Sequence, residues 1–310
     1  MGACRQMTVD AAGSARDSGA ALAERAEDNG GVPASPFFTV VVSVFNGAET
    51  LRQCIDSVSS QTWASKELII IDGGSTDGTV EILRENASKI AFWLSEPDRG
   101  IYHAWNKALD RARGRWICFL GADDYLYSPD VLARLSPVLT GAYPAVRIVY
   151  GQVSVVNSQE KEINRIGESW DSARKRFSQI MCVPHTALMH HRSLFEVHGE
   201  FNESFRVAGD YELLLRELRE HDALFVSNMI VAGMRHGGVS SDPSGSVLLL
   251  KEFRRAQRMH GSTHPGRYWV SAYIKAYIRV ALWRLLGTRI APYVFDFGRL
   301  ISGKRSYWTR

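Results

Sequence analysis

The sequence predicts an α/β fold in which helices flank a mostly parallel central sheet, and three observations support this. Continuous β-branched apolar runs, typical of strands covered on both faces, alternate with segments whose apolar residues recur at helical spacing. Polar or acidic residues follow several of these runs directly. A chain of 310 residues with 45% hydrophobic content can also bury a full core, as one large domain or two smaller ones.

The N-terminal segment and the cysteine pattern argue against several protein classes. Residues 1–36 are rich in Ala, Gly, Ser and charge and lack the apolar stretch of a secretory signal, so we expect a disordered lead-in. No charge-free apolar run of about 18 residues occurs, which argues against a membrane-spanning helix. The four cysteines are widely spaced without a CxxC pair, so a zinc site is not indicated. We therefore expect a cytoplasmic protein.

The first predicted strand is the run FFTVVVSVF at residues 37–45, which ends in the turn Asn46-Gly47. A helix follows, because apolar residues then recur at i, i+3, i+4 and i+7. The second strand is ELIII at residues 67–71, which ends at Asp72. A strand, helix and strand in this order predict a right-handed crossover and parallel pairing.

The segment DGGSTDGT, residues 72–79, joins the second strand to a helix that we expect to begin near Thr76. Its glycines permit close backbone approach, and Ser75, Thr76 and Asp77 can cap exposed amides. Such a loop can hold a nucleotide. An ordinary turn between a strand and a helix is the alternative.

A third strand is predicted at residues 90–95, followed by a helix from Ile101 and by the apolar run WICFLGADDYL at residues 116–126. This last run is interrupted by Asp123 and Asp124. Two adjacent carboxylates at the mouth of a sheet repel each other and are costly to desolvate, so they face water or a cation. The alternative is that they only shape a turn.

The polar strand ends are predicted to share one edge of the sheet. Asn46, Asp72 and the pair Asp123 and Asp124 each follow a strand-like run. In open α/β sheets, ligands bind outside the carboxyl ends of the strands. These residues are therefore the first candidates for a binding site.

Residues 38 to about 216 resemble the nucleotide-sugar-dependent glycosyltransferases of the GT-A fold, specifically family 2. The resemblance rests on five ordered motifs: TVVVSVFNGAETLRQCIDSVSSQTW, ELIIIDGGSTDGT, SEPDRGIYHAWNKAL, GRWICFLGADDYL and PHTALMHHRSLFEVHGEFNESFRVAGDYELLLR. It implies a Rossmann-like, mostly parallel sheet and a catalytic domain over residues 37–245. It also implies a nucleoside-diphosphate-sugar donor.

By this resemblance, Val44, Phe45 and Asn46 lie against the nucleoside of the donor, and Asp72 reads its base. A pyrimidine imide N–H needs an acceptor, which a carboxylate at a strand end can supply. Asp123 would lie near the ribose or assist a metal ion.

The resemblance also implies that Asp124 holds a divalent metal, Mg²⁺ or Mn²⁺, on the donor diphosphate. This chain has Gly121 where many relatives carry an acid, so phosphate oxygens and water would complete the coordination. His236 is a candidate further ligand of metal or phosphate, and a loop histidine without a catalytic role is the alternative.

On the acceptor side, His185 matches a position in the wall of the site, although it could equally be a packed loop histidine. Asp210, in GDYELLLR, aligns with the acidic base of inverting family members. It precedes a helix-like apolar pattern, so it could also be an N-cap. The two roles are compatible, because a carboxylate at a helix N-terminus stays ionised at neutral pH.

Residues 246–310 form a basic, aromatic segment that we expect to be an amphipathic helical extension. Residues 251–310 hold 13 Lys or Arg against Glu252 and Asp296, a net charge of +11, so residues 1–250 carry −7 of the overall +4. A helix in the headgroup region of an anionic membrane, on the inner face of the cell membrane, fits this composition. Packing on the catalytic domain is the alternative. No nucleic-acid-binding motif accompanies the cations.

The combined expectation is an inverting glycosyltransferase that transfers one sugar to a hydroxyl of a saccharide or lipid-linked saccharide. The Gln-x-x-Arg-Trp element of processive family members does not follow Asp210. Two alternatives remain. One is a non-catalytic GT-A-like binding or scaffold protein, motivated by Gly121. The other is a sugar nucleotidyltransferase, which normally needs a glycine-rich triphosphate loop with basic residues that VFNGAE lacks.

Overall fold

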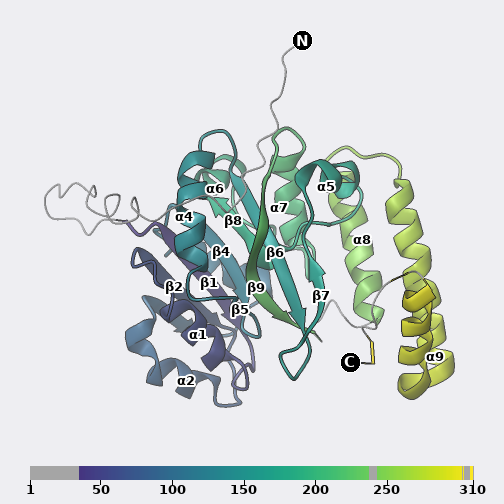
Figure 1. The fold of residues 1–310 in the computed structure, drawn as a ribbon, viewed down its shortest axis with the longest axis horizontal. Coiled ribbons are helices and arrows are strands. Elements are labelled where there is room, and N and C mark those ends of the chain that lie inside the picture. Colours follow the sequence, from purple (N-terminus) through teal and green to yellow (C-terminus); the bar gives the residue numbers. More distant parts are fainter. Residues whose placement is uncertain (1–34, 237–242, 302, 304–307, 310) are drawn as a thin grey trace, which may run out of the picture.

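The computed structural model describes residues 35–236, 243–301, 303 and 308–309 (Figure 1). The predicted lead-in therefore falls almost wholly outside the described residues, which begin at Ser35. The described chain forms a mixed α/β fold around one twisted sheet, as predicted.

Four parallel strands form the first half of the sheet. They are β1 (Phe38–Val44), β2 (Lys66–Asp72), β3 (Phe92–Ser95) and β4 (Trp116–Gly121), in the order β3-β2-β1-β4. The register pairs Val44 with Asp72 and Asp72 with Ser95, while Ser43 pairs with Gly121. The carboxyl ends of these strands therefore lie at one edge, which confirms the predicted parallel pairing.

The second half of the sheet is mostly antiparallel. Its strands are β8 (Leu188–His191), β6 (Ile148–Val156), β9 (Leu224–Arg235), β5 (Tyr125–Leu126) and β7 (Glu162–Ile166). β8 runs antiparallel to both β4 and β6, β9 is parallel to β6, and β5 and β7 pair antiparallel with β9 and β6. The predicted run at residues 116–126 is thus two strands, because the chain turns after Gly121 and β5 joins β9 instead.

Helices cover both faces of the sheet, as the continuous apolar strands require. One face packs against α1 (Leu51–Ser59), α2 (Thr79–Glu85) and α4 (Val131–Ala142). The other packs against α3 (Ile101–Leu109), α5 (Trp170–Phe177), α6 (Ser193–His198) and α7 (Gly209–Leu218). Short 3₁₀ turns occupy Ala87–Lys89 and His185–Ala187. Side chains of β1 alternate between the two cores, with Val41 on one face and Val40 and Val42 on the other.

The C-terminal segment forms α8 (Pro243–Met259) and α9 (Arg267–Ile301), which lie beside each other at one side of the molecule (Figure 1). The predicted boundary between residues 245 and 246 falls within α8, whose Leu250, Phe253 and Ala256 are buried in the core. α9 is broken at Gly287, and stacked rings of Trp283 and Phe295 join its two arms. Among the described residues, no helix is both long and apolar enough to cross a bilayer.

Candidate active site

The loops after β1 and β2 are joined by hydrogen bonds at the carboxyl edge of the sheet. The N–H of Asn46 donates to Ser75 Oγ at 2.7 Å, and Asn46 Oδ1 accepts from the N–H of Thr76 at 3.0 Å. The N–H of Gly47 donates to Thr79 Oγ1. Because Asp77 Oδ1 caps the N–H of Thr79, α2 begins at Thr79 rather than near Thr76. Asn46 is therefore a link between the two loops.

Asp72 is fully buried beneath the second loop. Its Oδ2 accepts hydrogen bonds from the N–H groups of Gly74 (3.2 Å) and Ser75 (3.0 Å) and from Ser95 Oγ (2.6 Å), and its Oδ1 accepts one from Ser75 Oγ. A carboxylate has about four acceptor sites, so the protein itself supplies as many donors as Asp72 can use. Asp72 thus organises the loop in this structure.

Phe45 provides the exposed apolar surface at this edge. Its side chain is 67% exposed, whereas the neighbouring Val44 is buried. Beside it, Gly73 has no room for a side chain, since a Cβ there would lie 2.7 Å from Asp98 Oδ2 and 3.4 Å from the Phe45 ring. Asp98 and Phe45 therefore already fill the space beside Gly73, and the surface open to a flat ring is the exposed part of Phe45.

Asp124 is a buried carboxyl at the end of β4. The N–H of Asp124 donates to the carbonyl of Gly121, which turns the chain back on the strand. Its Oδ2 accepts long hydrogen bonds from the N–H of Gly121 (3.3 Å) and from Thr186 Oγ1 (3.4 Å), while Oδ1 is buried and has no donor among the described residues. Burial and the charge of Asp123 raise the pKa of Asp124 to about 8. An uncompensated buried oxygen of this kind is suited to a cation.

Gly121 leaves space that the two acidic side chains occupy. A Cβ at this position would lie 2.6 Å from Asp123 Oδ1 and 3.1 Å from Asp124 Oδ2. Both carboxylates therefore fold back over the space that a side chain at residue 121 would occupy.

His185 lies in an aromatic cluster behind the acid pair. Its ring stacks on Trp105 at 5.0 Å between centroids and on Phe119 at 5.7 Å. Burial lowers the pKa of His185 to about 3, so the imidazole is neutral. Its Nε2 is buried without a hydrogen-bond partner among the described residues, so a substrate could bond to it only after the surrounding side chains move.

Asp210 lies in the first turn of α7, whose N-cap is Ala208 rather than Asp210. Its Oδ1 accepts hydrogen bonds from the hydroxyl of Tyr102 (3.2 Å) and the N–H of Tyr211 (2.8 Å). Burial raises the pKa of Asp210 to about 6, and the two hydrogen bonds oppose that rise. Burial also raises the pKa of Tyr102 well above its usual range, so the phenol remains a donor. At neutral pH, Asp210 is thus mostly ionised, but its pKa is close enough to the pH for it to accept a proton.

A chain of contacts joins Asp210 to Asp124. Tyr102 bonds to Asp210 and packs edge-on against Trp105, with ring centroids 5.4 Å apart. Trp105 stacks on His185, and the adjacent Thr186 bonds to Asp124. The structure therefore brings the predicted base, the acceptor-side histidine and the acid pair into one continuous region.

Comparison with known proteins is consistent with this arrangement. A family model described as Glycosyl transferase family 2 matches residues 39–198, about half of the chain. The chain belongs to glycosyltransferase family 2. Relatives include a PGL/p-HBAD biosynthesis glycosyltransferase of Mycobacterium tuberculosis, 36% identical over 59% of this chain and 70% of that protein. An uncharacterized glycosyltransferase of the same species is 32% identical over 59% of this chain and 69% of that protein.

Two solved structures share the fold of this family 2 glycosyltransferase. Staphylococcus aureus TarS 1-349 in complex with UDP-GlcNAc has a TM-score of 0.56 and 14% identity, over 77% of this chain and 71% of that one. The mannosyltransferase PcManGT from Pyrobaculum calidifontis, in complex with GDP-Man and Mn²⁺, has a TM-score of 0.56 and 21% identity, over 88% and 82%. At these identities the likeness shows the GT-A fold alone.

The donor set of this glycosyltransferase fits a divalent metal with few protein ligands. The unpartnered Oδ1 of Asp124 and the neighbouring Asp123 offer hard oxygen donors, which Mg²⁺ and Mn²⁺ accept together with phosphate and water. Among the described residues, no three His, Cys, Asp or Glu side chains form a metal cluster. His236, just after β9, instead packs its ring edge-on against Trp308 at 6.4 Å.

Two residues of the site were missed at the sequence level. Tyr102 lies inside a family motif and in the first turn of a helix that follows a strand end, so its position at the carboxyl edge was detectable. Its bond to Asp210 was not, because 108 positions separate them. Thr186 carried no signal beyond its place next to His185.

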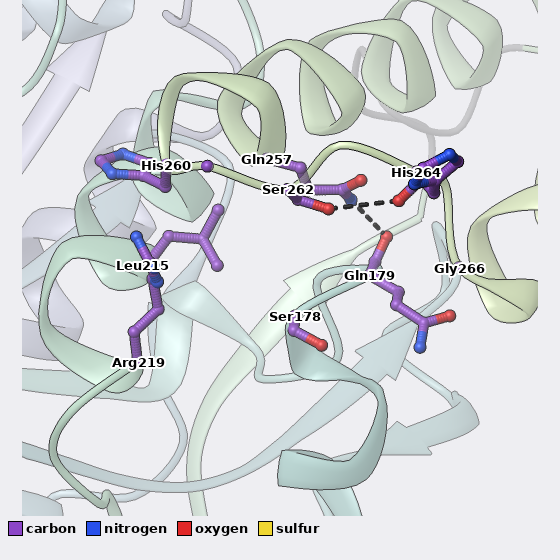
Figure 2. Close-up of a pocket in the computed structure, with 10 residues that line it drawn as sticks. Ser178, Gln179, Leu215, Arg219, Gln257, His260, Ser262, His264 and Gly266 are labelled. Atoms are coloured by element: carbon purple, nitrogen blue, oxygen red, sulfur yellow. Dashed lines mark hydrogen bonds between the residues drawn. The ribbon is translucent and has the colours of Figure 1, made fainter.

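A cavity of about 310 Å³ lies away from this site, between the end of α5, the C-terminal half of α7 and the loop from α8 to α9 (Figure 2). Leu215, Arg219 and His260 lie on one side of it, and the Gln257 side chain donates to the backbone carbonyl of Gln179. Arg219 is about 13 Å along α7 from Asp210, and none of the predicted site residues lines the cavity.

Proposed function

We propose that this glycosyltransferase inverts the anomeric configuration and transfers one sugar from a nucleoside diphosphate to a hydroxyl of a saccharide or lipid-linked saccharide. The proposal is supported mainly by the surroundings of Asp210: its pKa of about 6 and its hydrogen bond from Tyr102 suit a general base at neutral pH. The sugar nucleotides bound to TarS and PcManGT, and the glycosyltransferase name of the mycobacterial relative, support a nucleotide-sugar donor.

On the acceptor side, the Asp210 carboxylate takes the proton of the acceptor hydroxyl as its oxygen attacks the anomeric carbon. The bond between that carbon and the diphosphate oxygen breaks on the opposite face, and the leaving group departs as nucleoside diphosphate. Tyr102 keeps the Asp210 oxygen oriented through its hydroxyl. His185 forms part of the acceptor-side wall, where Trp105 fixes its ring by stacking, and its neutral Nε2 would bond to the acceptor only once that wall opens.

On the donor side, the nucleoside lies over Val44, Phe45 and Asn46. For Asp72 to read the base, one of its present hydrogen bonds from Ser75 or Ser95 has to be exchanged for the imide N–H. Asp123 is placed for the ribose, and Asp124, assisted by Asp123, would hold a divalent metal. Such a metal neutralises charge on the departing diphosphate.

His236 remains a candidate further ligand of the metal or of a phosphate. Burial lowers its pKa, so a neutral imidazole stands at the end of β9. Its ring contacts Trp308 edge-on, so part of the C-terminal segment lies next to the end of β9.

The C-terminal segment suits an acceptor held at a membrane. α9 exposes large apolar side chains: Ile274, Tyr277, Ile278, Leu285, Ile290, Tyr293, Val294, Phe297, Leu300 and Ile301. Basic residues of the same helix stand among them, and this combination favours an anionic bilayer surface. We therefore place the enzyme on the cytoplasmic face of the cell membrane, adding single sugars rather than a polymer.

Release of nucleoside diphosphate tests the proposal. Purified full-length protein is incubated with UDP-glucose, UDP-GlcNAc, UDP-galactose, GDP-mannose and dTDP-rhamnose, each with Mg²⁺ or Mn²⁺. We expect metal-dependent release from at least one donor, slow with water and faster with saccharide acceptors, and a product of inverted configuration by NMR. A product that retains the donor configuration would contradict the proposal, as would the absence of binding and release for all donors with either metal.

A further inference from the structure

Glu252 of α8 holds the backbone that leads into the helix of Asp210. The side chain is 7% exposed. Its Oε2 accepts hydrogen bonds from the N–H groups of Arg206 (3.1 Å), Val207 (2.9 Å) and Ala208 (3.0 Å), and its Oε1 accepts from Arg206 at 2.9 Å. One buried carboxylate from a distant helix thus binds three consecutive amides.

These amides precede the N-terminus of α7, where helices normally leave N–H groups without partners. The N-cap residue Ala208 has no side-chain acceptor, and Glu252 binds the N–H of Ala208 itself and the two amides before it, from α8, which packs beside α7 (Figure 1). Consecutive N–H groups that point into one concavity form an anion-binding nest, and the helix dipole adds to the attraction. Asp210 follows only two residues after the last of these amides.

The opposite side of the same segment is held by α3. Asn106 donates to the carbonyl of Phe201 and accepts from its N–H, both at 3.0 Å. The backbone at Gly209 packs directly against the Tyr102 ring, since a Cβ at residue 209 would lie only 2.9 Å from that ring. The segment 201–209 is therefore fixed between α3 and α8, and the direction of the Asp210 side chain depends on both supports.

We propose that Glu252 is a positioning residue for Asp210, so that the C-terminal segment, through α8, takes part in building the catalytic centre. This inference rests on the proposed role of Asp210 as the base. Glu252 donates no proton and contacts no substrate in this account; it acts by fixing residues 206–208.

The negative charge of Glu252 should also affect the pKa of Asp210, which a support that acts through geometry alone would not do. The charged or titratable side chains that act on Asp210 are Tyr102 from α3, which lowers its pKa, and Glu252 from α8, which raises it. Loss of the Glu252 charge should therefore lower the pKa of Asp210, and the acid limb of the rate profile should move to lower pH.

Three variants of the full-length protein separate geometry from charge. Glu252→Gln removes the charge and presents an NH₂ group to part of the nest. Glu252→Asp keeps the charge on a shorter side chain. Glu217→Gln is the control, because Glu217 is another buried carboxylate, in the last turn of α7, where it pairs with Arg147 and His198. Each is assayed for kcat, donor KM and pH dependence with the fastest donor of the panel above and Mn²⁺, and for amide exchange at residues 206–208.

We expect Glu252→Gln to lower kcat by roughly 10- to 100-fold, since a displaced catalytic group costs rate more than donor affinity, and to leave donor KM unchanged. Its acid limb should shift to lower pH and residues 206–208 should exchange faster. Glu252→Asp should share the rate loss and keep the acid limb of the wild type. Glu217→Gln should lower thermal stability without changing the pH profile or that exchange.

Wild-type kcat and exchange in Glu252→Gln would overturn the inference, and so would equal rate losses in Glu252→Gln and Glu217→Gln without a pH shift. If Glu252→Gln does not fold, Glu252→Asp decides, because wild-type kcat there excludes a positioning role. If the wild type turns over no donor, the proposed function fails separately. Carbon-13 NMR titration of Asp210 and exchange at residues 206–208 then decide: a lowered pKa with faster exchange in Glu252→Gln supports the inference, and no change in either overturns it.

Discussion

At the scale of single residues, the chemistry of the site depends on which hydrogen-bond donors each buried carboxyl group receives. Asp124 is buried and Asp210 is partly buried, and burial raises the pKa of each, but their surroundings differ. Asp210 receives donors from Tyr102 and from the N–H of Tyr211, whereas one oxygen of Asp124 receives none within the described chain. The first arrangement suits proton transfer, and the second suits a cation.

The hydrogen bond from Tyr102 gives a pH-dependent prediction. This bond stabilises the ionised form of Asp210, so Tyr102→Phe should raise its pKa above about 6. Because the base must be ionised, activity falls as the pH drops through that pKa. The acid limb of kcat in Tyr102→Phe should therefore lie at higher pH than in the wild type. An unmoved acid limb would show that this bond does not tune the base.

Gly121 gives a second prediction at this scale. Gly121→Ala places a methyl group 2.6 Å from Asp123 Oδ1, so the acid pair has to move. The nearest atoms are the ends of side chains, so the shift should cost little stability, but it displaces the carboxylates and we expect donor affinity to fall about tenfold. Calorimetric titration with the donor found in the panel measures it.

The control for Gly121→Ala is Gly141→Ala in α4, where a Cβ meets nothing within 4 Å. This control should bind donor like the wild type and gain slight helix stability. Unchanged donor affinity in Gly121→Ala would mean that the positions of the two carboxylates are not tied to this glycine.

At the scale of elements, the site is assembled from strand ends and helix starts. The sequence predicted the parallel strands and their polar ends, because hydrophobic periodicity and turn residues are local signals. It did not predict that the WICFLGADDYL run divides into β4 and β5, because the partner of β5 is β9, more than 100 residues later. For the same reason it did not predict the hydrogen bond from Tyr102 to Asp210 or the bonds from residues 206–208 to Glu252.

The joined loops after β1 and β2 can be tested at Asn46. This residue has a φ of 51°, which glycine adopts freely and alanine does not. Both Asn46→Ala and Asn46→Gly lose the bond to the N–H of Thr76, but only the alanine variant adds backbone strain. Urea denaturation should show Asn46→Ala to be less stable than Asn46→Gly by about 1 kcal/mol. Equal stabilities would indicate that the loop relaxes out of this conformation.

At the scale of the whole molecule, the charge asymmetry seen in the sequence corresponds to a distinct part of the structure. The two acids of residues 251–310 are both buried and both bind backbone amides, Glu252 before α7 and Asp296 at Trp308 and Thr309. The net positive charge of this segment is therefore accompanied by only two acidic side chains, and both of these also serve backbone amides. Composition predicted a basic helical extension that is either amphipathic at a membrane or packed on the domain, but it could not predict that α8 would pack into the core while α9 exposes apolar side chains.

Membrane association of α9 is tested with lipid vesicles. Leu285 and Phe297 are 80% and 65% exposed, so the double variant Leu285→Ser with Phe297→Ser should fold normally. Burying one such side chain contributes about 1.5–3 kcal/mol, so binding to vesicles that contain phosphatidylglycerol should weaken at least about tenfold. Higher salt should weaken wild-type binding as well, because it screens the cations. Sedimentation with vesicles measures both effects.

The control for the vesicle experiment is Val197→Ser, on α6 and 59% exposed, which should bind like the wild type. Equal binding by the wild type and the α9 double variant would refute membrane docking through this surface.

The central claim, that Asp210 is the base of an inverting transfer, is tested most directly by Asp210→Asn. The amide keeps the shape of the side chain but cannot take a proton, so we predict that transfer falls by about 10²- to 10⁴-fold. Donor affinity should stay at the wild-type value, because the nucleotide site that we propose lies at the ends of β1, β2 and β4, away from Asp210. Donor binding and acceptor glycosylation are measured on the same preparation. Transfer at the wild-type rate would contradict the claim.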